Sequence, residues 1–311
     1  MIVPGKEAQY LAPAADNLFF PPAKDGYNYF EMPGYTPNEP YLREVARAAD
    51  AAMLAYARFV RQRLNIDDLK AILDRAGNLL IKPIGDCFVD NANTARGFFA
   101  ANDQYGLLAF RVTEEDNAND KLTDLDAAMV PENGAYVHKG FKRYLDAVWP
   151  DVSQWVGDWR EGHPDAPITI TGHSLGAVLA SLAFTRLKDP NTSLITFGCH
   201  RVGNREYCKQ IENAARNQKC NRVVDDLDIV THVPPQLFYE QPGIALLWLS
   251  DKHELIANPP HPPDDWLDVI KLLSRFVTTH WFENLPDPLP EPLADHSPVR
   301  YCQWIGQAAK V

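Results

Sequence analysis

The stretch Ile168-Thr-Ile-Thr-Gly-His-Ser-Leu-Gly-Ala177 decides the fold class of this 311-residue chain. Its first four residues predict a strand, and the small and apolar residues from Ala177 onward predict a helix. Only a short turn is left between the two. Ser174 therefore lies where a strand turns directly into a helix.

The chain downstream of this stretch continues to alternate between strand and helix. Helices are predicted at 174–187 and 205–216, and strands at 168–171, 194–197 and 222–224. Alternation at this spacing is typical of parallel βαβ units with right-handed crossovers. Further elements are predicted upstream: helices at 41–63 and 140–149, short antiparallel strands at 79–81 and 97–100, and a buried strand at 106–110.

The turn itself has the pattern G-x-S-x-G, formed by Gly172, His173, Ser174, Leu175 and Gly176. A nucleophilic serine needs a strained, tight turn that projects its hydroxyl from the sheet edge, and the glycines leave room where a Cβ would collide. The start of the helix directs the Leu175 N–H toward a developing oxyanion. The pattern predicts an α/β-hydrolase with a central, mostly parallel sheet and helices on both faces. A plain serine helix cap is the alternative.

An acid and a base are expected after the serine, in the order Ser, Asp or Glu, His. Asp225, Asp226 and Asp228 follow the strand that ends at Val224. Apolar neighbours favour Asp228 as the buried, oriented acid, whereas the other two are expected to be solvated or to form the turn.

Five histidines follow Asp228, at positions 232, 253, 261, 280 and 296. His261 lies in a proline-rich stretch and His280 inside a predicted helix, which are poor places for a base that must reach a serine. His296 precedes a short helix with Pro298 in its first turn, and a loop position on a rigid scaffold suits a general base. The predicted triad is Ser174, Asp228 and His296.

Several segments together resemble the class 3 lipases, the fungal-type family of α/β-hydrolases. They span roughly residues 40–305. In the first half, Ala109–Thr113 resembles A-F-R-G-T, Val137–Phe141 matches V-H-x-G-F, and Thr171–Ala177 matches T-G-H-S-L-G-[GA]. In the second half, Thr196–Asn204 resembles T-F-G-x-P-R-V-G-N, Asp228–Pro235 is similar to D-I-V-x-x-[LV]-P-P, and Asp295–Ser297 followed by Tyr301 resembles the histidine motif. The resemblance implies the same triad. It also implies that the Thr113 N–H is the second oxyanion donor beside that of Leu175.

Two positions depart from the family pattern. Val112 replaces the glycine before Thr113, so the oxyanion loop must tolerate a β-branched residue. His200 replaces a proline, and we expect a structural role for it.

Many family members cover the site with an apolar lid helix after the oxyanion strand. Here that segment, 114–121, is polar, so a lid of that type is not expected. A predicted amphipathic helix at 264–282 is the possible cap or lid, although packing on the core is the favoured interpretation; its apolar residues are Trp266, Ile270, Leu273, Val277 and Trp281. For the domain organisation, we expect a Pro- and aromatic-rich arm at 1–40 and a single domain at 41–311, with 259–292 as a possible cap insertion. The arm is a second candidate for covering the active site.

Composition and charge limit the classes of molecule that the chain is expected to bind. A net charge of −11 argues against nucleic acid and anionic membranes, and leaves a neutral lipid interface or a small ester open. The absence of CxxC and HExxH patterns predicts no metal, and no cofactor is expected. The first seven residues have no secretory pattern, and no stretch is long enough to span a bilayer. We expect a soluble chain, either cytoplasmic or secreted with its leader removed, and leave its oligomeric state open.

Five cysteines, at positions 87, 199, 208, 220 and 302, cannot all pair with one another. Reduced, mostly buried thiols are favoured over a disulfide between Cys208 and Cys220, because a helix from Cys208 would hold the two apart.

Hydrolysis of a carboxylic ester through an acyl-enzyme is the leading expectation from these features. Acylglycerols or other fatty-acyl esters are the first substrate class, with short soluble esters and the acyl bond attacked by A1-type phospholipases as alternatives. A non-catalytic lipid-binding protein, with its oxyanion loop disabled at Val112, is the competing class.

Overall fold

The structure is a computed structural model, and it describes residues 40–55, 80–84, 95–112, 128–216, 220–226, 228–234, 238–250, 252, 254–259 and 294–308. The helices are α3 (Pro40–Leu54), α6 (Lys139–Gly162), α7 (Leu175–Leu187), α8 (Arg205–Ala215) and α11 (Pro298–Ala308), with a 3-10 turn η2 (Ile229–His232). The strands are β1 (Leu80–Ile84), β2 (Ala95–Ala101), β3 (Gly106–Val112), β4 (Met129–Glu132), β5 (Ala135–His138), β6 (Ile168–His173), β7 (Thr192–Phe197), β8 (Asn221–Asp225), β9 (Ala245–Leu249) and β10 (Leu255–Ala257).

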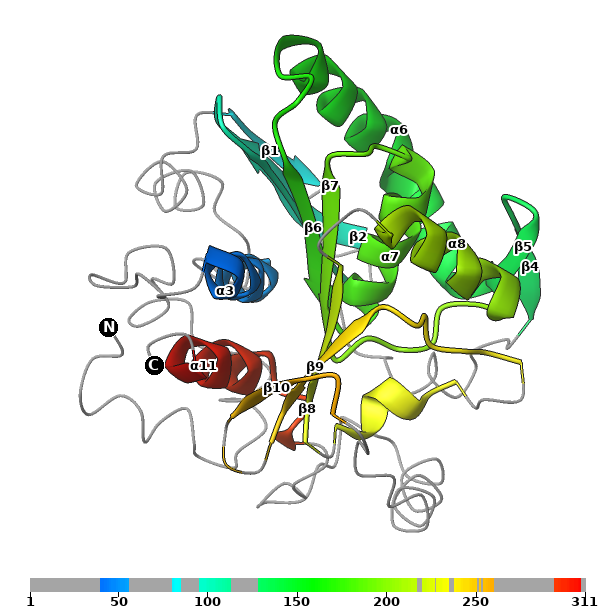
Figure 1. The fold of residues 1–311 in the computed structure, drawn as a ribbon. Helices are drawn as coiled ribbons and strands as arrows, with labels where there is room; N and C mark the ends of the chain where they lie inside the picture. Colours follow the sequence, from blue (N-terminus) through cyan, green and yellow to red (C-terminus); the bar gives the residue numbers. More distant parts are fainter. Residues whose placement is uncertain are drawn as a thin grey trace, which may run out of the picture.

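Eight of the described strands form one central sheet in the order β1-β2-β3-β6-β7-β8-β9-β10 (Figure 1). Strands β3, β6, β7, β8 and β9 run parallel to one another. The two strands at one edge and β10 at the other pair antiparallel. This is the mostly parallel sheet predicted from the alternation of elements. The strand predictions at 79–81, 97–100 and 106–110 are also confirmed, within a few residues at each end.

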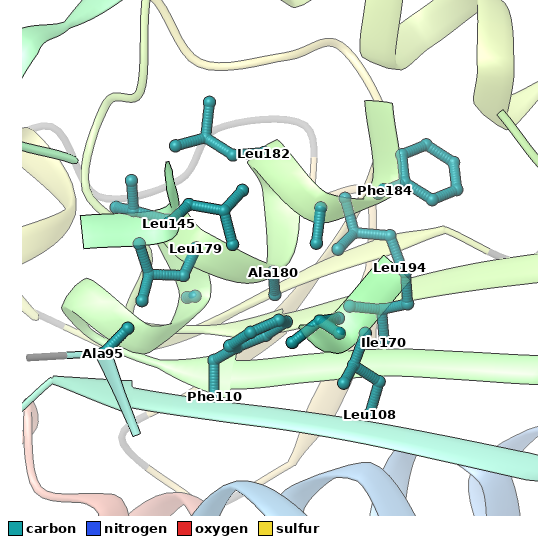
Figure 2. Close-up of a cluster of buried hydrophobic side chains, with 14 of the residues drawn as sticks. Ala95, Leu108, Phe110, Leu145, Ile170, Leu179, Ala180, Leu182, Phe184 and Leu194 are labelled. Atoms are coloured by element: carbon teal, nitrogen blue, oxygen red, sulfur yellow. The ribbon is translucent and has the colours of Figure 1, made fainter. Parts of the chain in front are cut away.

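Helices cover both faces of the sheet, as predicted: α6, α7 and α8 lie on one face, and α3 and α11 on the other (Figure 1). A hydrophobic core lies between the sheet and the helices on each face, and strand β7 contributes to both cores because its successive side chains point to opposite faces. Leu194 packs into the core under α7, whereas Ile195 and Phe197 pack under α3 and α11. Figure 2 shows Leu194 among side chains from β3, β6 and α7. Each fully buried side chain of this size contributes about 2 kcal/mol of hydrophobic stabilisation.

Helix α6 continues beyond its predicted end at Trp149. Pro150 lies inside the helix and is exposed to solvent. Val148 and Val152, on either side of it, are buried in the core. The burial of apolar residues before and after the proline outweighs the single helical hydrogen bond that it removes.

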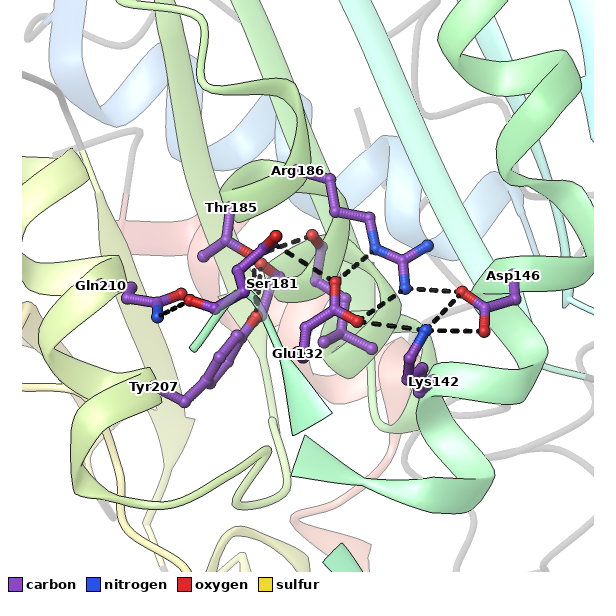
Figure 3. Close-up of polar contacts among 10 residues, drawn as sticks. Glu132, Lys142, Asp146, Ser181, Thr185, Arg186, Tyr207 and Gln210 are labelled. Carbon is purple, nitrogen blue, oxygen red and sulfur yellow. Dashed lines mark hydrogen bonds and ion pairs between the residues drawn. The ribbon is translucent and has the colours of Figure 1, made fainter. Parts of the chain in front are cut away.

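A short hairpin, β4–β5, was not predicted from the sequence. It is attached to the helices by Glu132, which is 7% exposed and binds the Arg186 guanidinium at 2.8 Å (Figure 3). Lys142 of α6 lies 3.2 Å from the same carboxylate, and Arg186 also contacts Asp146 at 2.6 Å. Because two of these side chains are nearly buried, the network stabilises more than an exposed ion pair would.

Several expectations fall on residues that the structure does not describe: 1–39 of the arm, 56–63 of the first predicted helix, the polar segment at 114–121 and residues 260–292 of the cap insertion. Of the cysteines, Cys87 also lies outside the described residues. The other four are free and buried, so the expected reduced thiols are confirmed there, and Cys208 and Cys220 form no disulfide. No helix in the described ranges is long and apolar enough to cross a membrane.

Asp50 places a carboxyl group in the contact between α3 and α11. Its side chain is buried, and Cys302 of α11 donates a long thiol hydrogen bond to it, with Sγ and Oδ1 3.7 Å apart. Burial raises the pKa of Asp50 well above its ordinary value, although the Cys302 thiol acts in the opposite direction. The folded protein therefore retains a proton that the unfolded chain releases.

We expect the contribution of Asp50 to the free energy of unfolding to fall as the pH rises above about 4, the pKa of an unfolded aspartate. The contribution of the Asp50 proton is complete below that value and is lost as the pH rises through the higher folded pKa. Asp50→Asn removes this term, so urea midpoints should change less between about pH 5 and about pH 8 than in wild type. Asp158→Asn, on the exposed side of α6, is the control and should retain the wild-type slope. Equal slopes for Asp50→Asn and wild type would contradict this assignment.

Candidate active site

Ser174 lies in the turn between β6 and α7. Its backbone has φ 56° and ψ −126°, a conformation that residues with a Cβ rarely adopt. The turn is held by hydrogen bonds from Ser174 N to Phe197 O and from Ala177 N to Ser174 O, both 3.0 Å long. Such a conformation costs on the order of 1–3 kcal/mol and persists only where the surroundings enforce it. The strain is the one expected of a nucleophile held on a tight turn.

Two glycines make this turn possible by allowing backbones to approach closely. A Cβ on Gly172 would lie 2.4 Å from the carbonyl atoms of Gly176. A Cβ on Gly176 would lie 2.2 Å from the carbonyl oxygen of Phe110 in β3. Both obstacles are backbone atoms, which cannot move aside as a flexible side chain would. The two glycines of the motif are therefore required for the packing of α7 against β6 and β3.

The structure brings Ser174, His296 and Asp228 together from distant parts of the sequence. His296 Nε2 lies 2.9 Å from Ser174 Oγ, and His296 Nδ1 lies 3.0 Å from both carboxylate oxygens of Asp228. The three residues are only 3%, 5% and 1% exposed, respectively. With the proton of the neutral ring assigned to Nδ1, which donates to the carboxylate, Nε2 accepts from the serine hydroxyl.

Asp228 is held by bonds to both of its oxygens. Oδ1 accepts from Val230 N at 3.0 Å, because Asp228 caps η2, and Oδ2 accepts from the Tyr301 hydroxyl at 2.6 Å. Burial alone would raise the pKa of Asp228. The charge of His296 and the hydrogen bonds from His296 and Tyr301 outweigh burial and hold that pKa below its ordinary value. Asp228 thus remains an acceptor that orients and stabilises the imidazole.

Asp225 differs from its expected role as a solvated loop carboxylate. Strand β8 extends to Asp225, whose side chain is 2% exposed. Burial, and then the nearby carboxylates of Asp295 and Asp228, raise the pKa of Asp225 well above its ordinary value. The sequence prediction was wrong here because the strand is one residue longer than its apolar part. Asp226, in contrast, lies half-buried in the turn, as expected.

His173, the second residue of the motif, contacts His296 directly. It is 2% exposed, and its Nε2 donates to the carbonyl oxygen of His296 at 2.8 Å. Burial lowers the pKa of His173 well below its ordinary value, and the charge of His296 acts in the same direction. A neutral His173 therefore fixes the backbone of His296.

Gly198 was not singled out from the sequence, although it belongs to the T-F-G segment. Its φ is +55°, and a Cβ there would lie 2.7 Å from Asp228 Oδ2 and 3.0 Å from His296 Nδ1. Any side chain at this position would push the acid and the base apart. The sequence shows the glycine, but only the folded chain shows what its missing Cβ makes room for.

Of the predicted oxyanion and cap residues, only Leu175 lies among the described residues. Leu175 begins α7, so its N–H has no acceptor one helical turn earlier and is available at the end that faces Ser174. Thr113 lies outside the described residues; Val112 before it ends β3, where Val112 pairs with Ala95 as an ordinary strand residue and Phe110 pairs with Gly172. The cap residues Trp266, Ile270, Leu273, Val277 and Trp281 also lie outside. Across the described ranges, no group of three or more His, Cys, Asp or Glu side chains could hold a metal ion.

Tyr301 is expected to support turnover through its hydrogen bond to Asp228. Its hydroxyl donates to Asp228 Oδ2 and accepts from Asp225 N at 2.9 Å, so Tyr301→Phe leaves the carboxylate with one bond fewer. Hydrogen bonds to charged groups contribute about 1.5–3 kcal/mol, and we expect kcat to fall by about tenfold or more. The pKa of Asp228 should also rise, because one of the hydrogen bonds that lower it is lost.

The control is Tyr207→Phe, which removes a buried hydroxyl bonded to Ser181 O at 3.1 Å and to Thr185, away from the triad. This variant should lose stability and retain its kcat. Equal loss of kcat in the two variants would show that Tyr301 acts through stability alone.

The arrangement is suited to acyl transfer from an ester. A serine hydroxyl, an imidazole and a buried carboxylate lie in hydrogen-bonded order, with a helix start beside the serine. Such a set generates an alkoxide-like nucleophile without a metal ion.

Known proteins with similar sequences and folds are named as lipases. Residues 107–238 match the family described as lipase (class 3). A lipase of Rhizopus niveus is 37% identical over 122 residues, which cover 37% of this chain and 31% of that protein. A secreted mono- and diacylglycerol lipase of Malassezia globosa is 28% identical over 137 residues, covering 42% and 43%.

A solved structure, the lipase from Rhizopus microsporus var. chinensis, is similar to this fold with a TM-score of 0.54 and 28% identity. The match covers 67% of this chain and 74% of that one. The chain thus shares the fold of α/β-hydrolase lipases. In sequence, it spans less than half the length of the two curated relatives described above.

Proposed function

We propose that the chain is a member of the class 3 lipase family, whose description matches residues 107–238, and that it is a serine ester hydrolase acting on fatty-acyl esters. The observation that carries the proposal is the contact of His296 Nε2 with Ser174 Oγ at 2.9 Å, with Asp228 behind the ring.

The reaction begins when Ser174 Oγ attacks the ester carbonyl carbon and His296 Nε2 takes the hydroxyl proton. His296 then gives this proton to the leaving alcohol, and the acyl group remains on Ser174. Water, deprotonated by the same imidazole, hydrolyses the acyl-enzyme and restores the serine. Asp228 stabilises the imidazolium in both steps without taking its proton.

The tetrahedral intermediate requires donors for its oxyanion. The Leu175 N–H is the first, because it lies at the positive end of α7 beside Ser174. Thr113 is the proposed second donor, following directly after the end of β3. Loss of one such donor typically costs on the order of 3 kcal/mol of transition-state stabilisation.

Acylglycerols are the substrate class we favour, since the Malassezia relative is named for mono- and diacylglycerols. The net charge of −11 disfavours an anionic surface, so we propose that a bulk substrate would be a neutral lipid interface.

A series of p-nitrophenyl esters of increasing acyl length, together with emulsified triacylglycerols, tests this function. We expect turnover of medium and long chains, and mass labelling of Ser174 by an organophosphonate ester. A preference for short soluble esters would make the protein a carboxylesterase. If none of these esters is cleaved and no label is taken up, the proposed hydrolase function is wrong.

A further inference from the structure

His200 has an unusual environment for a buried histidine. It follows β7 by three residues, in the segment that resembles T-F-G-x-P-R-V-G-N, where it replaces the proline. It is 1% exposed, and no atom of the described residues meets hydrogen-bond geometry with either of its ring nitrogens, although the backbone of Ser174 lies close enough to act on its pKa. Buried polar groups nearly always have a partner, because leaving one without costs its full desolvation energy.

Other histidines near the site satisfy at least one nitrogen within the protein. His173 donates to the His296 carbonyl, and His138 Nδ1 accepts from Gly140 N at 3.1 Å. A loosened turn at the former proline position, which is the structural role expected from the sequence, requires no imidazole. That role therefore leaves the two unpartnered nitrogens of His200 unexplained.

The ring of His200 lies beside the catalytic base. Its centroid is 6.4 Å from that of His296, with the two rings perpendicular, and 6.2 Å from that of Phe141. The same chain segment contacts the triad two residues earlier, at Gly198. His200 therefore adjoins the ring that contacts Ser174 Oγ.

The ring is also uncharged under ordinary conditions. Burial lowers the pKa of His200 to about 3, and the charge of His296 adds to the effect, whereas the charge of Asp228 and the nearby backbone of Ser174 oppose it. A neutral imidazole offers one N–H donor and one lone-pair acceptor.

We propose that His200 is a specificity-determining residue that binds a hydroxyl group of the substrate close to the scissile ester. A hydroxyl both donates and accepts, so it is served by either nitrogen whichever tautomer is present, whereas a carbonyl is served only by the N–H. The proposal rests on the proposed ester hydrolysis and deepens it, because it adds a polar requirement to a reaction otherwise defined by acyl groups.

Two pairs of nearly isosteric esters locate the hydroxyl. Methyl 3-hydroxypropanoate and methyl butanoate differ by a hydroxyl or methyl on the acyl side. 2-Hydroxyethyl butanoate and propyl butanoate differ in the same way on the alcohol side. The ratio of kcat/KM within a pair, hydroxyl over methyl, is independent of how much of a preparation is folded, because both esters meet the same enzyme.

We expect His200→Leu to lower this ratio by about tenfold in one of the two pairs, since it removes one hydrogen bond from a buried site. His200→Gln retains a donor and an acceptor and should preserve most of the ratio. His163→Leu is the matched control. The His163 ring is hydrogen-bonded to Trp159 O, at the end of α6 opposite His138, and the ratios of this variant should equal those of wild type.

Unchanged ratios in both pairs for His200→Leu would overturn the role of His200. In that case, cleavage of methyl butanoate by wild type and its loss in Ser174→Ala would leave the proposed hydrolase function intact. If wild type cleaves none of the four esters nor the longer esters above, both proposals fall together.

Discussion

Ser174→Ala is expected to lower kcat on any ester substrate by about a millionfold, as loss of the nucleophile does in other serine triads. The hydroxyl that would attack the carbonyl is the one bonded to His296 Nε2 at 2.9 Å, and no other group can take its place once the oxygen is gone. The remaining activity should be that of a bound ester attacked by water. Binding should change little, because alanine retains the Cβ and the backbone N–H groups of the turn.

A matched control lies in the same helix. Ser181 is also buried, and its Oγ donates to Ala177 O at 2.9 Å, within its own helix. Ser181→Ala should retain kcat within a few-fold. Initial rates on a p-nitrophenyl ester and labelling by an organophosphonate distinguish the two, and full turnover by Ser174→Ala would disprove the triad.

Gly176→Ala is expected to have the largest effect on folding. The added methyl group would lie 2.2 Å from Phe110 O, 2.8 Å from Phe110 C and 2.9 Å from Arg111 Cα, all in the backbone of the neighbouring strand. Either α7 moves away from β3 or the sheet distorts, and both changes open the main core. We expect a loss of about 3–5 kcal/mol in the free energy of unfolding.

Gly157→Ala provides the comparison. Gly157 lies inside α6 and is exposed, and a methyl group added there would have no atom of the described neighbours within 4 Å. Alanine is the better helix former at this position, so stability should rise by about 0.5–1 kcal/mol. Urea unfolding followed by circular dichroism measures both variants. A Gly176→Ala protein as stable as wild type would show that the approach of α7 to β3 is not tight.

Local patterns were sufficient to predict most of the elements that carry the site. The β-branched residues before Gly172 and the apolar residues after Gly176 predict β6 and α7, and the structure contains both at nearly those bounds. The elements that were missed or cut short have weaker local signals. Strand β9 was not predicted, because it is less clearly set off as a strand from the residues around it. Helix α6 was predicted too short because it contains Pro150, and a proline normally ends a helix unless packing on both sides of it keeps the helix intact.

The sequence by itself predicted the alternation of strands and helices around the site, the strained serine turn, and Asp228 and His296 as partners of Ser174, because each depends on residue types and short spacings. Only the tertiary structure revealed Tyr301 behind the acid, Gly198 between acid and base, the burial of Asp225 and the unpartnered ring of His200. These features depend on which atoms meet across long stretches of chain, as Tyr301 and Asp228 do at a separation of 73 residues. Such contacts follow from the packing of the whole sheet and its helices, and no local pattern contains them.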